Sequence, residues 1–538
     1  MRAPAGYRGQ FRTDDVARAL YAEGAGIFRI LPAAVAVPAD REDLALLARW
    51  AHAGGVAVVP RGAGSGMPGG NVGTGVVVDL SRAFREEPAV DAGARTARAG
   101  ASVTYRALNA AAERQGLSLP PDPSSGAFCT LGGMVATNAS GARTLKYGAM
   151  RAWVRGLEFV TAEGETGRAD ARTHGRTAAE RRFERDVAPG IRAHASELEA
   201  AAPRTTKNSS GYALDAWARS GATTDLLTGS EGTLAMVTGV EVALAPLPAR
   251  RSTLLVTLRS LDDVGPAVQA LRPLGPSAME LLDRTYLDLV RDAAQGRVPD
   301  GTEAVLLVEF EGDGRGAVEA VRHLASTTEL AVDPASVSRL WELRHLASPI
   351  LARLPGQQRS LQVVEDGCVP VDVLGRYIRA LREAADAHRF GIVIFGHAGD
   401  GHLHANLLAD VSQPDFPARL ASCLEAVTGV QLSLGGTPSG EHGDGRLRAP
   451  FVARAFGDAY LELCRRTKAA WDPTGILNPG VKLAAEGAAP FRAETLKVGP
   501  AAPPIPDAVA AKLRELERAA GWAAFKLDLV PGPDGAAR

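Results

Sequence analysis

The sequence predicts an α/β protein of two or three domains, on three observations. At 538 residues the chain is too long for a single hydrophobic core. Hydrophobic residues make up 46% of it with few aromatic ones, and glycine and proline are spread throughout, which fits a soluble α/β enzyme. Short apolar strands alternate with segments of helical periodicity along the chain.

Bulk composition excludes several other classes. The net charge of -1 and a sequence pI near 6.8 give no support for binding nucleic acid. Four widely spaced cysteines form no CxxC, so neither a disulfide framework nor a cluster site is expected, and a reducing compartment is indicated. No apolar run approaches the ~20 residues of a membrane span, and no signal peptide is evident. We expect a protein of the cytoplasm, either free or peripheral to the inner face of the membrane.

A glycine-rich loop follows the first strongly predicted elements. Ala39 to Gly54 has helical periodicity with Asp40 as its N-cap, and Val56 to Val59 is a buried strand. The loop Pro60 to Gly70 leads into a second strand, Gly75 to Leu80. Its free backbone N–H groups could surround phosphate oxygens, although a flexible glycine hairpin has the same pattern. Because a strand follows it, the loop is not the nicotinamide dinucleotide fingerprint.

The remainder of the first half alternates helices, strands and small-residue turns. We expect a helix at Thr104 to Gly116 and strands at Val154 to Thr161 and Val237 to Ala245. A flat ligand could lie against the small-residue segment Thr130 to Gly141. The charged tract Arg168 to Glu199 is expected to form a solvated helical face.

Pro246 to Pro248 marks a boundary to a second layered α/β unit. Its predicted strands are Ser252 to Leu258 and Ala304 to Phe310, and its predicted helices are Val264 to Leu271 and Gly316 to Ala325. A later helical piece places Arg344 and Ser348 on one face. An arginine there is usually a surface ion-pair partner, whereas in a pocket it would bind a carboxylate with two parallel hydrogen bonds.

Three of the ten histidines fall between Phe395 and Asn406, in a glycine-rich turn between two strands. Strand alternation puts His402, His404 and Asn406 on one face, and His397 can fold back toward them. A second turn, Ser439 to Gly445, carries Glu441 and His442 side by side. Two histidines and a glutamate are a recognised divalent-metal set, and a further histidine is left as a base. The alternative is a group of solvated or capping histidines.

The C-terminal region begins after Asp472 to Gly480. A proline-rich linker, Gly499 to Pro506, precedes an amphipathic helix at Asp507 to Ala520 with Val509, Leu513 and Leu516 on one side. We expect this helix to dock on the body of the protein or on a partner.

Seven separated motifs together carry a family resemblance. They are PRGAGSG at Pro60, PPDPSS at Pro120, TLGGMVATNASG at Thr130, GSEGTL at Gly229, GHAGDGHLH at Gly396, SGEHGDG at Ser439 and DPTGILNPG at Asp472. In this order they resemble the FAD-linked oxidoreductases of the vanillyl-alcohol oxidase / p-cresol methylhydroxylase fold. Within that fold they are most similar to the D-2-hydroxyacid dehydrogenase branch, which includes D-lactate, glycolate and D-2-hydroxyglutarate enzymes.

The resemblance covers about Ile27 to Leu483 and implies an α+β fold class. A two-lobed FAD-binding domain of the vanillyl-alcohol oxidase type would span 27–247. A ferredoxin-like α/β substrate (cap) domain would span 248–483. The linker and short helix would occupy 484–538.

The resemblance also implies the cofactor site. Its FAD-binding residues would be Arg61, Gly62, Ala63, Gly64, Ser65, Gly66, Pro121, Asp122, Ser124, Gly132, Gly133, Asn138, Gly141, Glu231, Val237 and Asn478. Relatives with covalent flavin carry a histidine in or near the first loop, and none stands there in this chain. We therefore expect non-covalent FAD.

For catalysis, the resemblance implies His397, His404 and Glu441 as ligands of a divalent metal, zinc or manganese, and His442 as the base. The substrate 2-hydroxy acid would be held by Arg344 and Asn406, with Ser348 a weaker candidate, and its hydride would pass to N5 of the flavin.

Two departures from the family pattern qualify these roles. His402 stands where many relatives have Asn, which leaves the ligand set open. Val363 to Asp366 occupies the region of a lysine that some 2-hydroxyglutarate enzymes use, which weakens the case for a dicarboxylate substrate.

The resemblance also bears on partners. Without cluster cysteines at its C-terminal end, the chain would need a separate electron acceptor, which could be an iron–sulfur protein, an electron-transfer flavoprotein or a quinone; a homodimer is compatible with it. Three other readings remain: an alkyl-glycerone-phosphate synthase or aldonolactone-oxidase-like enzyme, a non-catalytic flavoprotein subunit of a larger oxidase complex, and a zinc hydrolase.

Overall fold

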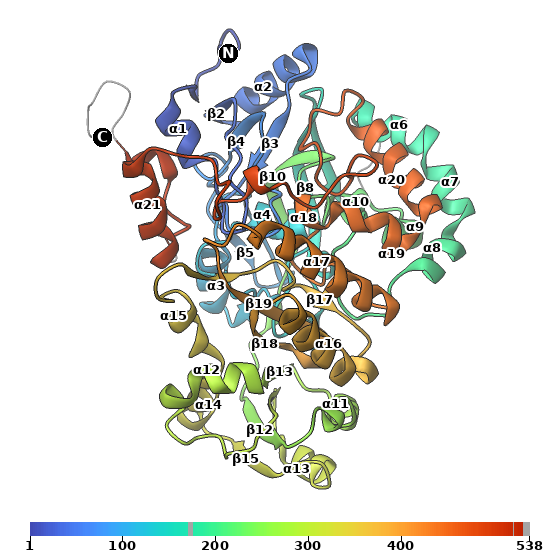
Figure 1. Cartoon of the computed structure of the whole chain (residues 1–538). Helices are drawn as coiled ribbons and strands as arrows, with labels where there is room; N and C mark the ends of the chain where they lie inside the picture. The colour runs from blue at the N-terminus through green and yellow to red at the C-terminus, as the bar shows by residue number, and fades with distance from the viewer. Residues whose placement is uncertain (171–175, 520, 531–538) are drawn as a thin grey trace.

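The computed structural model describes residues 1–170, 176–519 and 521–530, and its chain is organised by three main β-sheets (Figure 1). The first sheet has the order β1-β2-β4-β3, from β1 (Gln10–Arg12), β2 (Ala34–Val37), β3 (Val58–Arg61) and β4 (Val76–Asp79). Helix α2 (Arg41–Gly54) connects β2 to the parallel strand β3 and packs Leu44 and Leu47 on the sheet. Its N-cap is Asp40, which accepts from the N–H of Asp43, as the sequence predicts.

The second sheet is antiparallel and has the order β5-β6-β10-β8-β9. Its strands are β5 (Ala89–Asp91), β6 (Thr96–Gly100), β8 (Val154–Thr161), β9 (Thr166–Asp170) and β10 (Ala235–Ala243); the short pair β7 (Leu117–Ser118) and β11 (Ala245–Pro246) lies apart from it. The helices that share its core include α3 (Tyr105–Glu113), α4 (Leu131–Thr137), α9 (Leu214–Ser220), α10 (Thr223–Leu227), α19 (Val452–Phe456) and α20 (Asp458–Trp471).

The third sheet is an antiparallel eight-stranded sheet with helices on both faces. Its order is β15-β12-β14-β13-β18-β19-β16, with β17 also paired to β19. The strands are β12 (Ser252–Leu258), β13 (Ala278–Asp283), β14 (Ala304–Phe310), β15 (Thr327–Ala331), β16 (Gln358–Leu361), β17 (Gly367–Cys368), β18 (Gly391–His397) and β19 (His402–Asp410). One face packs on α11 (Val264–Leu271), α13 (Arg315–Val321), α16 (Leu374–Ala387) and α17 (Phe416–Ser433), and the other on α12 (Arg284–Ala294) and α14 (Pro334–Glu342). Because strand residues alternate between faces, β12 contributes Leu254 to one core and Leu255 to the other.

Two predicted segments differ from the structure. The segment at 130–141 is not wholly irregular, because α4 forms within it despite two glycines, with Thr130 as its N-cap. The charged tract at 168–199 is only partly a solvated helical face: it begins in β9, and 171–175 lie outside the described residues. Its helices α6 (Ala178–Asp186), α7 (Ala188–Ala193) and α8 (Ala195–Ala201) bury Phe183, Ile191 and Leu198 because a helix of mixed sequence still packs its apolar side.

The C-terminal segment, which we define as residues 507–519 and 521–530, docks on the body of the protein. Its helix α21 (Asp507–Arg518) lies beside α1 (Asp15–Leu20), as the red and dark-blue ribbons show in Figure 1. Val509, Leu513 and Phe525 share a core with residues of α1, β2, β3 and β4. Of the two uses predicted for the helix, docking on the body is the one observed. The division into domains at 247 and 483 stays a prediction. None of the described helices is both long enough and apolar enough to cross a membrane.

Candidate active site

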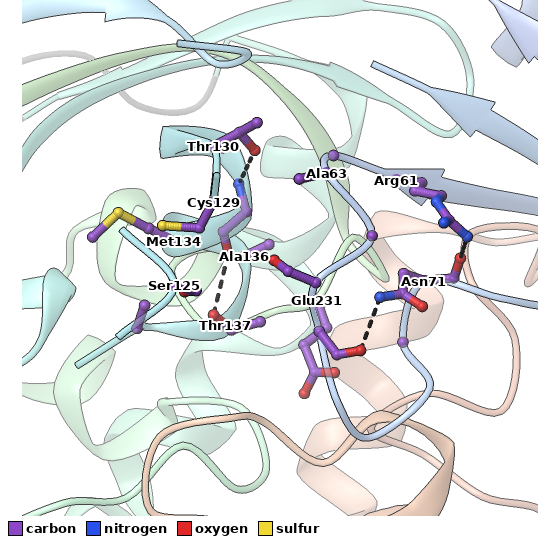
Figure 2. Close-up of a pocket in the computed structure, with 18 of the residues that line it drawn as sticks. Arg61, Ala63, Asn71, Ser125, Cys129, Thr130, Met134, Ala136, Thr137 and Glu231 are labelled. Atoms are coloured by element: carbon purple, nitrogen blue, oxygen red, sulfur yellow. Dashed lines mark hydrogen bonds between the residues drawn. The ribbon is translucent and has the colours of Figure 1, made fainter. Parts of the chain in front are cut away.

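A first cavity of about 450 Å³ lies between the first two sheets and the turn that carries Glu441, and Figure 2 shows part of its wall. Most of the predicted FAD residues line it, namely Arg61, Gly62, Ala63, Gly64, Ser65, Gly66, Ser124, Gly132, Gly133, Glu231 and Val237. Asp122 and Gly141 line a neighbouring cavity instead, and Pro121, Asn138 and Asn478 line neither.

Arg61 is a buried cation at the edge of this cavity. Its Nη1 donates to the carbonyl oxygens of Tyr21 and Asn71 at 3.4 and 3.3 Å, the second of which is drawn in Figure 2. Its Nη2 is buried without a hydrogen-bond partner among the described residues. Burial lowers the pKa of Arg61, and Tyr21 and Asp79 offset only part of this effect. An unpartnered guanidinium nitrogen beside a glycine-rich loop fits an anionic group such as the diphosphate of FAD.

Two other predicted cofactor residues, Asn478 and Glu231, connect segments of the cavity wall by hydrogen bonds. Asn478 Nδ2 donates to the carbonyl oxygens of Gly70 and Glu231 at 2.7 and 2.9 Å. The carboxylate of Glu231 accepts from the N–H groups of Asp444 and Gly445 at 2.7 and 2.9 Å. The loop after β3 is thereby connected to the turn that carries Glu441 and His442.

A second cavity of about 850 Å³ lies against the eight-stranded sheet. The predicted catalytic and metal residues all line it: Arg344, His397, His404, Asn406, Glu441 and His442, together with Ser348. Glu441 and His442 line the first cavity as well. These two side chains therefore stand on the wall that the two cavities share.

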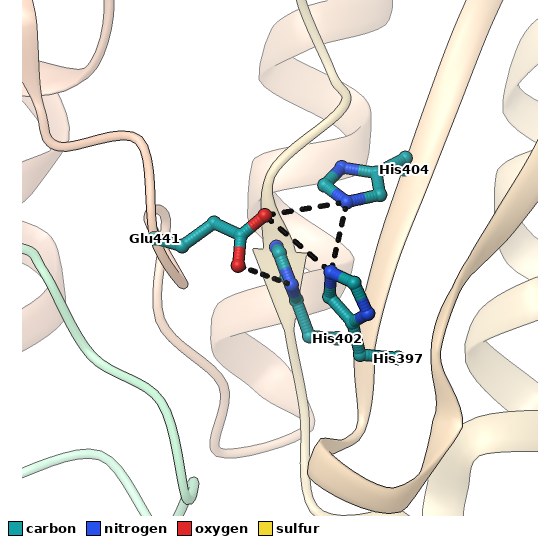
Figure 3. A group of neighbouring side chains, drawn as sticks. All are labelled: His397, His402, His404 and Glu441. Atoms are coloured by element: carbon teal, nitrogen blue, oxygen red, sulfur yellow. Dashed lines mark hydrogen bonds and ion pairs between the residues drawn. The ribbon is translucent and has the colours of Figure 1, made fainter. Parts of the chain in front are cut away.

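Three histidines and Glu441 form a buried cluster on this wall (Figure 3). Strand pairing places His397 at the end of β18 opposite His402 at the start of β19, and His404 projects from the same side of β19. Glu441 Oε1 lies 3.5 Å from His397 Nε2 and 3.4 Å from His404 Nε2. Its Oε2 lies 3.8 Å from His402 Nδ1. One ligand atom from each of the four residues lies within 4.8 Å of the others.

The second nitrogen of each histidine in the cluster faces an acceptor. His397 Nδ1 lies 2.5 Å from Glu280 Oε1, and His402 Nε2 lies 2.9 Å from Asp366 Oδ1. His404 Nδ1 lies 3.0 Å from the carbonyl oxygen of Glu365. These acceptors fix the proton of each ring on the nitrogen that faces away from Glu441. The inner nitrogens, which face Glu441, therefore present lone pairs to a common point.

The charge states of His402 and Glu441 also suit a cation. Burial lowers the pKa of His402 to about 3, and its inner nitrogen Nδ1 has no hydrogen-bond partner among the described residues. Burial raises the pKa of Glu441, but Lys207 and His397 outweigh it and hold that pKa well below its usual range. A carboxylate and neutral imidazoles are the donors that Zn²⁺ and Mn²⁺ accept. The cluster therefore fits a divalent cation, with His402 as a fourth candidate ligand beside the predicted three.

His442 lies beside the cluster and is held by a buried carboxylate. Its Nδ1 is 2.7 Å from Glu365 Oε2, and its Nε2 is 3.6 Å from Glu441 Oε1. Burial lowers the pKa of His442, but Glu365 and Asp366 outweigh this effect and raise the pKa to about 10. Arg448 in turn donates to Glu365 Oε1 at 2.7 Å.

Arg344 also lines the second cavity. It lies in a single 3-10 turn, Leu343–His345, and its guanidinium carbon is 4.4 Å from the centroid of the Phe395 ring. Its Nε donates to Glu280 Oε2 at 2.8 Å, while its terminal nitrogens make no hydrogen bond with the described residues. Glu280 therefore orients both Arg344 and His397, and the fork of Arg344 is left for a ligand.

The sequence analysis did not identify four residues that contact the predicted site residues, namely Lys207, Glu280, Glu365 and Asp366. Lys207 Nζ donates to Glu441 Oε2 at 2.9 Å, across 234 positions of the chain. No spacing rule connects such distant residues. The one available signal is the acidic pair Glu365-Asp366 directly after two apolar residues, because charges in apolar surroundings are usually paired.

Comparisons with known proteins show the family to which the chain belongs. Residues 247–481 match the family described as FAD linked oxidases, C-terminal domain, and residues 32–170 match the FAD binding domain family. The chain is 31% identical over 464 residues to the glycolate oxidase subunit GlcD of Bacillus subtilis, covering 84% of this chain and 89% of that protein. It is 32% identical over 456 residues to the D-lactate dehydrogenase of Archaeoglobus fulgidus, covering 83% and 90%. It is 31% identical over 539 residues to the D-2-hydroxyglutarate dehydrogenase of Pseudomonas putida, covering 91% of this chain and 52% of that protein.

Solved structures support the fold. A 4-ethylphenol oxidase from Gulosibacter chungangensis superposes with a TM-score of 0.62 at 14% identity, covering 88% of this chain and 94% of that one. An alkyldihydroxyacetonephosphate synthase superposes with a TM-score of 0.59 at 17% identity, covering 87% and 83%. At this identity the likeness concerns the fold alone, and it confirms the predicted fold class.

Proposed function

Because the chain belongs to the family of FAD-linked oxidases, we propose that it is an FAD-dependent dehydrogenase that oxidises a D-2-hydroxy acid of the lactate, glycolate or 2-hydroxyglutarate class. The product is the corresponding 2-oxo acid, and a divalent cation and His442 assist the reaction. The observation that carries the proposal is the shared wall. Glu441 and His442 face both the cavity that suits FAD and the cavity that suits the substrate.

Substrate binding follows from the side chains that line the second cavity. The free terminal nitrogens of Arg344 form two parallel charge-assisted hydrogen bonds with the substrate carboxylate. Asn406 and Ser348 contact the remaining polar groups. Because Glu280 holds Nε of Arg344, the guanidinium is oriented before substrate arrives.

His442 accepts the proton of the α-hydroxyl. An alcohol proton is too weakly acidic to leave unaided at neutral pH. A cation held by His397, His404 and Glu441, with His402 as a further ligand, would make that hydroxyl more acidic and lower the pKa of His442. Glu365 keeps the imidazole of His442 in one orientation throughout.

FAD, bound non-covalently along the Arg61 to Gly66 loop, supplies the acceptor for the hydrogen on the α-carbon. Zn²⁺ or Mn²⁺ is the proposed cation, since both accept imidazole and carboxylate ligands. The reduced protein passes its electrons to a separate acceptor, which is an iron–sulfur protein, an electron-transfer flavoprotein or a quinone.

Anaerobic mixing of the purified holoprotein with a substrate panel tests the proposal. We expect D-lactate, glycolate or D-2-hydroxyglutarate to bleach the flavin absorbance, and L-lactate to leave it unchanged. A flavin that none of these 2-hydroxy acids reduces would overturn the proposed function.

A further inference from the structure

The C-terminal segment forms part of the wall of the first cavity. Glu517 and Trp522 line that cavity together with the loop that begins at Arg61. Both residues lie outside the two ranges that match the family, 32–170 and 247–481. The family resemblance therefore assigns no role to them.

The segment is seated by close packing. Leu513 and Phe525 are buried in a core with Leu20, Val59 and Val77, so the segment is attached to the strand that leads into the loop. Such burial is worth ~1.5–3 kcal/mol for each large apolar side chain. The position of the segment at the cavity is therefore fixed by the fold.

Polar contacts extend this attachment to the loop itself. Lys497 Nζ lies 2.9 Å from Glu517 Oε1 and donates to the carbonyl oxygen of Ala25 at 3.5 Å. The N–H of Ala25 donates to the carbonyl oxygen of Gly64 at 3.0 Å. A short chain of contacts thus joins the segment to the glycine-rich loop.

A buried lysine lies next to Trp522 in this segment, with its Nζ 5.3 Å from the centroid of the Trp522 ring. Lys526 is 2% exposed, and among the described residues its Nζ donates only to the carbonyl oxygens of Trp522 and Ala524, at 3.5 and 3.2 Å. Burial, and after it the charge of Arg61, lowers the pKa of Lys526 to about 7, and Asp79 offsets part of this effect. Within the described part of the chain, neither Lys526 nor Arg61 has a carboxylate within ion-pair distance. Buried charges are normally paired, so an anion is expected beside Arg61, whose Nη2 is buried at the cavity without a partner among the described residues.

Different parts of FAD would occupy the two ends of the cavity. Under the proposed function, the reactive ring of the flavin lies at the wall of Glu441 and His442, where the substrate cavity begins. The diphosphate and adenosine then extend to the part of the cavity that the Arg61 loop and the C-terminal segment enclose.

We propose that the C-terminal segment is part of the FAD site: Trp522 packs against the adenosine diphosphate half of bound FAD, and Lys526 acts with Arg61 to offset the charge of the diphosphate. The orientation of FAD in this proposal rests on the proposed function. The enclosure of the cavity by the segment does not.

FAD titration of the apoprotein tests the proposal, with flavin fluorescence as the readout. Trp522→Ala should raise the Kd for FAD about tenfold to a hundredfold, the loss expected for one buried aromatic contact. Trp522→Phe should retain most of the affinity. Lys526→Met should also weaken binding and should reduce the dependence of Kd on salt. Lys512→Ala, on an exposed position of α21, is the matched control and should leave Kd unchanged.

The melting temperature of each apoprotein separates binding from folding. A lower melting temperature with an unchanged Kd for Trp522→Ala would show that Trp522 only packs on the body, and would overturn the proposal. A wild-type Kd for both Trp522→Ala and Lys526→Met would overturn it as well. Failure of the proposed function is distinguishable, because a flavin that 2-hydroxy acids do not reduce can still show these differences in Kd.

Discussion

The Nδ1 atom of His442 lies 2.7 Å from Oε2 of Glu365, whose side chain is buried, whereas His442 itself lines both cavities. Glu365 also accepts from Arg448 at 2.7 Å. Burial raises the pKa of Glu365, but His442 and Arg448 outweigh it and hold that pKa well below its usual range. The carboxylate is therefore ionised at neutral pH, and under the proposed function it leaves Nε2 of His442 to face the substrate.

Glu365→Gln should lower kcat about tenfold to a hundredfold, the usual loss when a supporting carboxylate is removed from a functional histidine. The amide no longer offsets a positive charge on His442, so the acidic limb of the pH–rate profile should move to lower pH. Glu425→Gln, at an exposed position, is the control. An unchanged pH profile with a reduced kcat would indicate that Glu365 is only structural.

His442→Ala should reduce turnover by about 10²–10⁴-fold, because positioned acid–base catalysis has this size. Its FAD content, read from the flavin spectrum, should remain that of the wild type. Loss of the yellow cofactor in this variant would contradict the assignment of His442 as the base.

Chelation of the cation should abolish flavin reduction by the 2-hydroxy acid, and Zn²⁺ or Mn²⁺ should restore it. Elemental analysis should find about one cation per chain in the active protein. His402→Ala should lower cation affinity if His402 is a fourth ligand, whereas His388→Ala is a control remote from the cluster. An undiminished rate in metal-free protein would remove the cation from the scheme.

Arg344→Lys should raise KM for the 2-hydroxy acid about tenfold or more, since lysine cannot form the two parallel hydrogen bonds of a guanidinium. The variant also loses the bond from Nε to Glu280, so the new ammonium is poorly oriented. Steady-state kinetics provide the measurement. The Kd for FAD should stay at the wild-type value, because Arg344 lines only the second cavity.

Lys526→Met should remove a pH dependence from the stability of the FAD-free protein. Burial and the charge of Arg61 lower the folded-state pKa of Lys526 to about 7, although Asp79 offsets part of their effect. Between pH 7 and about 10 the unfolded chain therefore binds a proton that the folded chain does not. In this window the free energy of unfolding should rise with pH by at most about 1.4 kcal/mol per pH unit.

The difference between wild type and Lys526→Met isolates this contribution from other titrating groups. Urea unfolding at pH 7, 8 and 9 gives the required free energies. A constant difference across these pH values would contradict the lowered pKa.

Local periodicity predicted much of the fold. The strands Val154–Thr161, Ser252–Leu258 and Ala304–Phe310 and the helix Val264–Leu271 have the bounds that the sequence predicts, because apolar residues predominate in each segment. Strand β13 was not predicted. It runs directly into helix α12, with Asp283 as both its last residue and the N-cap of the helix, so no turn residues mark where the strand ends.

The candidate site was predictable as far as its residues stand in short motifs. His397, His404, Glu441 and His442 come from two glycine-rich turns, and the structure brings them together. Glu280 and Lys207 come from segments with no such pattern. Their roles depend on tertiary contacts, which spacing along the chain does not encode.

The bonds from Glu231 to the N–H groups of Asp444 and Gly445 have a thermodynamic consequence. They connect the wall of the cavity proposed for FAD to the turn that supplies Glu441, so under the proposed function occupancy of one site should rigidify the other. By linkage, bound FAD should lower the Kd for the cation, and bound cation should lower the Kd for FAD by the same factor. Loading of the enzyme is then cooperative, and partly loaded molecules should be scarce.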